Sequence, residues 1–403
     1  MRAVDAMIPL DEALAIVDDT LATVRLPAET LPVRDALGRT LLLDATSRLD
    51  LPPFNKSAMD GYAILADDER HEYRLLGTVA AGEVASVPLA PGTTVRVMTG
   101  APVPPGAGKV VMQEDTQADG DIVRVLEHRN ATNICWQGED VRTGDVVMPR
   151  GTTLTATDLA NLVSCGLTEV TVSRRPRLAI ISTGDEIVDS PDLLEPGKIM
   201  DANGPLLAAL AREFGLDVVG ESSFPDDQQA IAQGIRSALS QADIVVLSGG
   251  VSVGQFDFVV EALRDAGLRV HFCRVAVKPG KPITYASGEG GIAFGLPGNP
   301  VSAYVGFHLF VLRAAARIAG AEPGMRRLTL QLATAFTRRA ADRAELVPAS
   351  LSEIGTVEPV EFHGSAHLAA LTRADGLFLV PRGVNSLPAG HEVAFMPLMR
   401  RRP

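Results

Sequence analysis

Five short segments in the second half of the chain combine glycine, proline, hydroxyl and charged residues, and each follows an apolar run. Their glycines let backbone N–H groups approach a ligand closely, and exposed N–H groups at such loops favour an anion. Lys278 and Lys281 lie in one of these segments, after Arg274, and add positive charge to the pattern. The segments are STGDE (182–186), FPDD (224–227), SGGVSVGQFD (248–257), KPGKP (278–282) and GLPGNP (295–300).

Acidic residues in the same segments supply hard oxygen ligands. Carboxylates that face a bound polyanion need a cation between them, and Mg²⁺ is the usual one. We therefore expect a phosphate or oxyanion site with Mg²⁺. The sequence contains neither GxxxxGK[ST] nor a GxGxxG after a strand, which argues against ordinary ATPases and NAD enzymes. The acidic residues are Asp185, Glu186, Asp226, Asp227 and Asp257.

Each of these features also has a purely structural alternative. The GG pair and KPGKP are common turn sequences, and Asp226 or Asp227 could simply cap a helix. Asp185 and Glu186 could be solvated acids in the first turn of a helix. If this alternative held throughout, none of the five segments would bind a ligand, although loops at the edge of a parallel sheet are where ligands bind.

The elements that must position these segments alternate between strand and helix over residues 177–320. Apolar runs such as RLAIIS and DIVVLS predict buried strands, and DANGPLLAALAREFG predicts a helix with Asn203 as a possible cap and Gly215 as its end. This alternation predicts a doubly wound parallel α/β domain. Because ligands bind beyond the carboxyl ends of parallel strands, we expect the five segments to meet on one rim.

The remainder of the chain divides into three further regions. Residues 9–22 have helical spacing with Pro9 at the first turn, and residues 153–166 predict a helix that Gly166 ends. Short β-like runs fill residues 31–149 and return after about residue 328. We therefore predict four domains: a helical and extended linking domain (1–45 plus 142–176), a β-rich domain (46–141), the α/β domain (177–327) and a small C-terminal β-barrel-like domain (328–403).

Two motifs in the β-rich region place polar side chains among apolar and small neighbours. PPFNKSAMDGYAI (52–64) contains Asp60, and VMTGAPVPPGAGKVVMQED (97–115) contains Thr99 and Glu114. A carboxylate in such a setting indicates a functional role beyond forming a turn, although Asp60 and Gly61 also fit the tight turn of a plain hairpin. Both interpretations stay open on the sequence alone.

Composition excludes several classes of protein. The 403 residues carry a formal charge of −12, which argues against a general binder of nucleic-acid backbones. Three distant cysteines without a CxxC pair favour a reducing compartment. Acidic residues near the N-terminus do not fit a signal peptide, and three polar residues interrupt the longest apolar stretch, 301–318, so we expect a buried helix there and a cytoplasmic protein without a membrane span.

Eight motifs, in this order and at these separations, resemble the molybdopterin molybdenumtransferase family, which comprises MoeA and the gephyrin E domain. The resemblance runs from about residue 8 to the C-terminus. The α/β part alone would also resemble molybdopterin adenylyltransferases and competence-damage-type proteins, and the MDGYA and TGAP motifs select the transferase. The motifs are SAMDGYA, VMTGAPVPPGA, GEDV, STGDEIV, DANGPLL, SGGVSVGQFDF, VAVKPGKP and LPGNPVSA.

The resemblance implies a reaction and a set of site residues. Family members take adenylated molybdopterin and molybdate, release AMP in an Mg²⁺-dependent step and leave molybdenum on the dithiolene sulfurs. They are homodimers with a composite active site, and a molybdopterin adenylyltransferase is the expected upstream partner. By motif position, catalytic roles fall to Asp60, Thr99, Glu186, Asp226 and Asp257, Mg²⁺ binding to Glu186 and Asp257, and substrate binding to Ser252, Arg274, Lys278, Lys281, Pro297, Pro300, Arg343 and Ser365.

The chain departs from the family pattern at a few positions. Cys135 stands where arginine is usual, Gln255 where an acid is common and Gly108 where aspartate is usual, and a second arginine is replaced around Pro348. Two other functions stay open: a scaffold that docks receptor tails, and a nucleotide-linked hydrolase of the competence-damage type. A scaffold should tolerate loss of Lys278 and Asp257, whereas such a hydrolase should lack the MDGYA domain.

Overall fold

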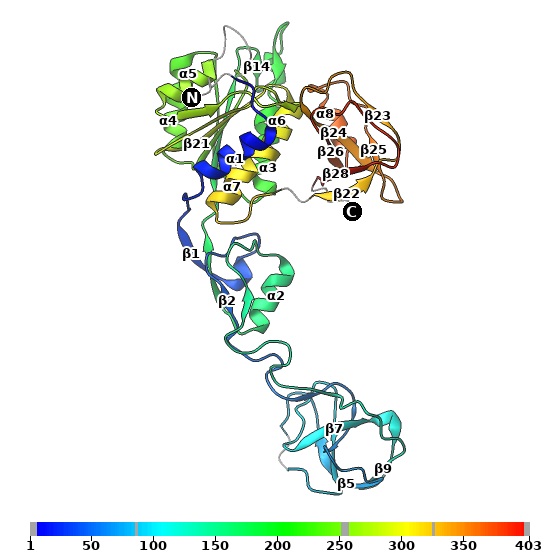
Figure 1. Ribbon diagram of the computed structural model, residues 1–403. Helices are drawn as coiled ribbons and strands as arrows, with labels where there is room; N and C mark the ends of the chain where they lie inside the picture. The colour runs from blue at the N-terminus through cyan, green and yellow to red at the C-terminus, as the bar shows by residue number, and fades with distance from the viewer. Residues whose placement is uncertain (1–5, 85–87, 251–257, 325–326, 399–403) are drawn as a thin grey trace. The chain divides into compact units, whose positions relative to one another are not determined.

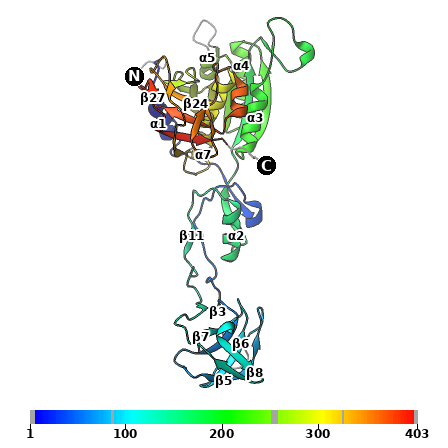
Figure 2. The same cartoon turned by 90° about the vertical axis from the view of Figure 1, so that its right-hand side faces the viewer.

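The computed structural model describes residues 6–84, 88–250, 258–324 and 327–398. The chain forms two compact units. Unit 1 comprises residues 1–29, 38–40 and 173–403, and unit 2 comprises residues 30–37 and 41–172. Figures 1 and 2 show the elements of each unit.

A six-stranded sheet forms the centre of unit 1. Its strand order is β16-β13-β17-β21-β20-β18, and the first four strands run parallel. The predicted doubly wound α/β domain is confirmed, but its sheet is mixed, because β20 runs antiparallel to β21. Only two residues connect β20 to β21, which suffices for a hairpin and is far too short for a parallel crossover. The strands are β13 (Arg177–Thr183), β16 (Asp217–Phe224), β17 (Ile244–Ser248), β18 (Arg269–Phe272), β20 (Thr284–Gly288) and β21 (Gly291–Leu296).

Alternate residues of the central strands face two separate apolar clusters. Leu178, Ile180 and Phe294 belong to the larger cluster, which also contains side chains of α1, α3 and the helix over residues 300–318. Ala179 and Ile181 belong to the other cluster, with side chains of α4 and α5. Helices therefore cover both faces of the sheet. They are α1 (Leu10–Thr20), α3 (Asn203–Glu213), α4 (Gln228–Leu239), α5 (Phe258–Asp265), α6 (Pro300–Gly306), the π-helical η4 (Phe307–Val311) and α7 (Leu312–Ile318).

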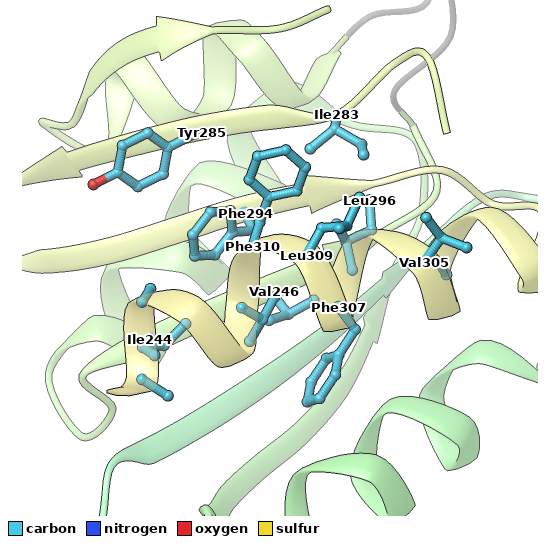
Figure 3. Packing of buried hydrophobic residues seen from close by; sticks show 14 of the residues in the cluster. Ile244, Val246, Ile283, Tyr285, Phe294, Leu296, Val305, Phe307, Leu309 and Phe310 are labelled. Carbon is cyan, nitrogen blue, oxygen red and sulfur yellow. The ribbon is translucent and has the colours of Figure 1, made fainter. Parts of the chain in front are cut away.

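Among the described residues, the continuous helix Pro300–Ile318 is long and apolar enough to cross a membrane by length and composition alone. Of its most apolar window, 78% is buried inside the protein. Figure 3 shows Val305, Phe307, Leu309 and Phe310 of this helix packed with side chains of the central strands. This helix is therefore part of the core, as predicted.

A second sheet in unit 1 joins the C-terminal part of the chain to the α/β part. Its order is β19-β24-β26-β28-β22, and β25 pairs with β24. The C-terminal strands of this sheet confirm a small C-terminal β domain. The short strand β19, from the KPGKP region, runs parallel to β24 and is a strand that the sequence did not indicate. The strands of this sheet are β19 (Val277–Lys278), β22 (Leu328–Gln331), β24 (Ala344–Leu351), β25 (Val357–Pro359), β26 (Gly376–Val380) and β28 (Glu392–Pro397). In the same part of the chain, β23 (Phe336–Thr337) pairs with β27 (Ser386–Leu387) in a separate two-stranded sheet, and α8 (Leu368–Arg373) precedes β26.

Helix α1 packs within unit 1 and not with residues 142–176, the group in which the predicted linking domain had placed it. Its apolar stripe, with Ala13, Leu14 and Val17, lies in the larger cluster of the α/β part. Asp18 forms ion pairs with Arg313 and Arg317 of α7. The apolar spacing that predicts the helix cannot show which surface covers its stripe, so only the fold decides the grouping.

Unit 2 contains a six-stranded sheet of order β7-β4-β6-β5-β9-β8 (Figure 2). Its strands are β4 (Gly61–Leu65), β5 (Glu72–Val79), β6 (Thr93–Val97), β7 (Ala107–Met112), β8 (Thr116–Asp119) and β9 (Ile122–Val125). A separate core in this unit surrounds α2 (Ala156–Ser164), and Gly166, two residues after the helix, has the positive φ (+80°) expected of the glycine that was predicted to end it. Two-stranded pairs complete the chain: β1 (Ala28–Pro32) with β12 (Glu169–Ser173), β2 (Ala45–Thr46) with β11 (Val146–Met148), β3 (Lys56–Ser57) with β10 (Ile134–Cys135), and in unit 1 β14 (Ile187–Val188) with β15 (Ile199–Met200).

Candidate functional site

Three of the five predicted segments meet at the carboxyl ends of β13, β17 and β21. The strands end in register, with Ser182 opposite Ser248 and Ser248 opposite Leu296. Gly249 N–H donates to Leu296 O at 3.2 Å. A Cβ on Gly249 would overlap Thr183 O, and a Cβ on Gly298 would lie 3.7 Å from Gly249 Cα. Glycine thus allows these loops to pack backbone against backbone at the rim.

The acidic residues of two neighbouring segments also come together. Asp226 N–H donates to Asp185 Oδ1 at 3.2 Å, and a Cβ on Gly184 would lie 2.5 Å from Glu186 Oε2. Burial raises the pKa of Asp226, and the negative charges of Asp185 and Glu186 raise it further. The Oδ1 atom of Asp226 is buried without a hydrogen-bond partner. No positive charge among the described residues offsets these effects on Asp226.

The capping alternative holds for Asp227. Its side chain accepts a hydrogen bond at 2.7 Å from Ala230 N, in the first turn of α4. The described residues contain no group of three His, Cys, Asp or Glu side chains arranged to hold a metal ion. Asp257, the other predicted Mg²⁺ ligand beside Glu186, lies outside the described residues, as do Ser252 and Gln255.

Asn203 does not cap α3, contrary to the prediction. Asp201 takes that role, since its Oδ1 accepts from the backbone N–H groups of Asn203 and Gly204 at 2.9 Å each. The buried Asn203 side chain instead donates through Nδ2 to Ser248 Oγ at 2.8 Å and to Gly298 O at 2.7 Å. Asn203 therefore ties two rim loops together. The DAN sequence offers two candidate caps, and only the fold shows which one is used.

The basic residues of the fourth segment lie beside the C-terminal sheet. Pairing of β19 with β24 sets Lys278 opposite Glu345, and Lys278 Nζ lies 2.7 Å from Glu345 Oε1. The Lys278 side chain is 45% exposed, whereas Glu345 is 8% exposed. Arg343 directly precedes β24, and its buried Nε has no hydrogen-bond partner among the described residues but lies 3.4 Å from Asp342 Oδ2. Both cations are therefore paired with carboxylates, and Lys278 has two further N–H donors beyond its pair with Glu345.

Glu345 also contacts Arg338, whose side chain is only 3% exposed. Arg338 donates to Val384 O and Pro381 O at 2.7 Å and to Arg343 O at 2.9 Å. Sequence reasoning missed both Glu345 and Arg338. The DRAE motif contains Glu345, but its pairing with Lys278 depends on the strand contact between distant parts of the chain.

The fifth segment holds Ser365 against the start of α6. Asn299 Nδ2 donates to Ser365 Oγ at 2.8 Å, and Val301 N donates to Ser365 O at 3.1 Å. Pro297 is buried, and Pro300 is the first residue of α6. The KPGKP segment also meets this helix, because a Cβ on Gly280 would lie 3.6 Å from Ser302 O.

Arg274 precedes the KPGKP segment and Lys281 lies within it, and Val275 N donates to Lys281 O at 2.9 Å. Parts of all five segments and the C-terminal residues Arg343 and Ser365 thus belong to unit 1, and hydrogen bonds and an ion pair connect several of these segments. Among the described residues, no hydrogen bond or ion pair involves the Arg274 or Lys281 side chain.

In unit 2, Asp60 and Thr99 are directly bonded. Asp60 Oδ1 accepts from Thr99 N and from Thr99 Oγ1, each at 2.7 Å, and these bonds lower the pKa of Asp60. The plain hairpin interpretation of Asp60–Gly61 is wrong, since β3 pairs with β10 while β4 pairs with β6 and β7. A Cβ on Gly61 would overlap Val111 O, so close strand contact explains this glycine.

Two departures from the expected family pattern have a visible environment in unit 2. A Cβ on Gly108 would overlap Ala66, so the chain has no room there for the aspartate that the resemblance leads one to expect. Cys135 is half-buried in β10, opposite Lys56 of β3. Pro348 lies buried within β24 of unit 1.

Models of three domain families match successive parts of the chain. They are the MoeA N-terminal region (domain I and II) over residues 8–166, a probable molybdopterin binding domain over 179–317, and the MoeA C-terminal region (domain IV) over 329–398. The molybdopterin molybdenumtransferase of Staphylococcus aureus (strain MRSA252) is 36% identical over 402 residues, which cover 96% of this chain and 94% of the relative. The chain belongs to the MoeA family of molybdopterin molybdenumtransferases.

Other MoeA-family proteins support this assignment along the whole chain. The molybdopterin molybdenumtransferase of Staphylococcus epidermidis (strain ATCC 35984) is 35% identical over 374 residues, or 89% of this chain and 88% of the relative. The crystal structure of the molybdopterin biosynthesis MoeA protein from Pyrococcus horikoshii OT3 matches with a TM-score of 0.84 at 30% identity, covering 98% of this chain and 100% of that one. The resemblance that the motifs indicated is confirmed.

Proposed function

We propose that this MoeA-family transferase inserts molybdenum from molybdate into adenylated molybdopterin and releases AMP, in the biosynthesis of the molybdenum cofactor. The observation that carries the proposal is the contact between the strand-end rim and the C-terminal part of unit 1. The strand-end rim offers close-packed backbone and acids, and the Asn299–Ser365 and Val301–Ser365 hydrogen bonds join it to the C-terminal part that contributes Arg343. The strand-end rim suits a nucleotide-linked pterin, and the C-terminal part with Arg343 suits a small oxyanion.

Lys278, Arg343 and Ser365 are the proposed oxyanion ligands. Molybdate carries two negative charges and only acceptor oxygens, so it needs cationic and hydroxyl donors. Lys278 uses one donor on Glu345, and Arg343 Nε forms only a 3.4 Å ion pair with Asp342 Oδ2 and, among the described residues, no hydrogen bond. Together they would hold molybdate and neutralise its charge, while no side chain needs to form a covalent intermediate.

The acidic end of the rim fits Mg²⁺. The unpartnered Oδ1 of Asp226 and its raised pKa reflect carboxylates without a positive neighbour, and a divalent cation would supply one. We propose Glu186, Asp226 and Asp257 as its ligands. When bound, Mg²⁺ would neutralise the phosphates and polarise the phosphoanhydride to AMP.

We further propose that the chain acts in the cytoplasm as a homodimer with a composite active site, supplied with adenylated molybdopterin by an adenylyltransferase. Three free cysteines suit a reducing compartment. The family resemblance supports the dimer, in which Asp60 and Thr99 of one subunit would face the α/β site of the other. Co-expression of an Asp60→Asn subunit with a Lys278→Ala subunit should restore part of the activity that each variant lacks alone. No restoration in purified heterodimers would refute the shared site.

The proposed reaction is tested by incubating the purified chain with adenylated molybdopterin, molybdate and Mg²⁺ while AMP release and pterin-bound molybdenum are measured. Wild-type protein should release AMP in proportion to the molybdenum inserted. Lys278→Ala and Asp257→Ala should lose both products and keep the wild-type circular dichroism spectrum. Wild-type turnover in both variants would favour a scaffold, and nucleotide products without molybdenum insertion would favour a hydrolase.

A further inference from the structure

We propose that Asn299 is a positioning residue that sets the direction of the Ser365 hydroxyl in the oxyanion site. The proposal rests on the proposed function, in which Ser365 binds molybdate. Asn299 belongs to the GLPGNP segment of the α/β part, whereas Ser365 lies 66 residues further along the chain, between β25 and α8. The two residues meet only through the packing of the C-terminal part on α6.

The geometry of this contact determines what the hydroxyl can do. A serine hydroxyl has one proton to donate and two lone pairs that accept. Asn299 Nδ2 donates to Ser365 Oγ at 2.8 Å, so one lone pair is occupied. Among residues 6–84, 88–250, 258–324 and 327–398, the Ser365 hydroxyl donates to no group, which leaves its proton free. Because molybdate has only acceptor oxygens, a hydroxyl in this state is prepared to donate to it.

Both partners are held in place by further bonds. The carbonyl of Gly298, directly before Asn299, accepts from Asn203 Nδ2 at 2.7 Å. Ser365 O accepts from Val301 N at 3.1 Å, so the serine is fixed through its backbone and through its side chain. Neither bond sets the rotation of the Ser365 hydroxyl about its Cβ–Oγ bond. The Asn299 amide is the group that does so.

The amide cannot be replaced by a carboxylate without reversing this arrangement. An aspartate at position 299 would accept from the Ser365 hydroxyl, so the proton would turn away from the oxyanion and a negative charge would lie beside it. Asn299→Ala would only release the hydroxyl to rotate. Asn299→Asp should therefore weaken oxyanion binding more than Asn299→Ala does.

A double-mutant cycle on the full chain tests the proposal, with molybdate alone as the titrant in isothermal calorimetry. Ser365→Ala should weaken binding about tenfold, as expected for one hydrogen bond to a charged group. Asn299→Ala should weaken it about threefold in the wild-type background and have no measurable effect in the Ser365→Ala background, because it acts through Ser365. Asn130→Asp, an exposed residue of unit 2, is the matched control for added charge and should bind like wild type.

The outcomes separate this inference from the proposed function. Equal effects of Asn299→Ala in both backgrounds would overturn the inference, because the residue would then act without Ser365. Unchanged binding in Ser365→Ala, with AMP release intact in the wild type, would overturn it while leaving the proposed reaction standing. Absence of molybdenum insertion by the wild type would instead refute the proposed function. Thermal unfolding of each variant at the wild-type temperature shows that the fold is retained.

Discussion

Replacement of Gly249 by alanine tests whether close packing of the rim loops controls the chemistry. Gly249 follows β17 with φ of +100°, and its Cβ position overlaps Thr183 O at the end of β13. Real Cβ atoms essentially never come within 3.0 Å of such a backbone atom, so the loop and β13 must separate. A displacement of about 1 Å in a substrate-positioning loop typically lowers turnover about 100-fold.

The same substitution also strains the backbone. A non-glycine residue at positive φ costs about 1–2 kcal/mol, apart from any steric overlap. Gly267→Ala is a matched control, because Gly267 has φ of +88° but nothing within 4 Å of its Cβ position. Both variants should therefore lose stability from strain, and only Gly249→Ala should also lose turnover.

The assay combines AMP release with hydrogen exchange. We expect Gly249→Ala to release AMP about 100-fold more slowly and to exchange faster at the backbone amide of position 249, which in the wild type donates to Leu296 O at 3.2 Å. Gly267→Ala should stay within about threefold of wild-type turnover, since only strain separates it from wild type. Wild-type turnover in Gly249→Ala, or an equal loss in Gly267→Ala, would refute the reasoning.

Three further changes probe the ion pairs, the acidic cluster and the core. Burial tends to raise the pKa of Asp18, but Arg313 and Arg317 outweigh it and lower the pKa below 3.8, so its stabilisation is present above pH 3.8 and is lost as the pH falls further. Asp18→Asn should therefore cost about 1–2 kcal/mol at pH 7 in urea denaturation, and the gap to wild type should close as the pH falls through the lowered pKa of Asp18. The pKa of Asp226 is raised, so its ionised form destabilises the metal-free fold above that pKa. Asp226→Asn should raise the thermal midpoint at pH 7 without Mg²⁺ and abolish any further rise on adding Mg²⁺, and a lower midpoint would contradict this. Phe294→Ala should cost about 3–5 kcal/mol by calorimetry, because Phe294 is fully buried and stacks on a neighbouring ring, and a cost below 1 kcal/mol would show that the core refills the cavity.

The local chemistry of the rim was largely predictable. Parallel strands end at one edge, so apolar runs followed by STGDE and SGG segments predict neighbouring loops, and the structure places Thr183, Gly249 and Leu296 together. Asp226 and Asp227 show the limit of this reasoning. Adjacent and identical in type, they differ because only Asp227 meets free N–H groups of α4.

Contacts between distant segments were not predictable in the same way. The pairing of Lys278 with Glu345 depends on β19 joining a sheet formed almost entirely by residues after 328. Helix α1 has an apolar stripe that fits many surfaces, and the choice of α7 depends on Arg313 and Arg317 lying near Asp18. Asn203 reaches two loops only because α3 starts beside the ends of β17 and β21.

The sequence by itself determined the types of element, the chemistry of each loop and, through motif order, the family. These features depend on residues close in the chain, where periodicity, turn residues and charge act over a few positions. Tertiary structure alone decided which side chains share a site: Lys278 with Glu345, Ser365 with Asn299, Asp60 with Thr99. Such pairs form because burial of apolar surface brings remote segments together, and local sequence does not encode which remote surface becomes the neighbour.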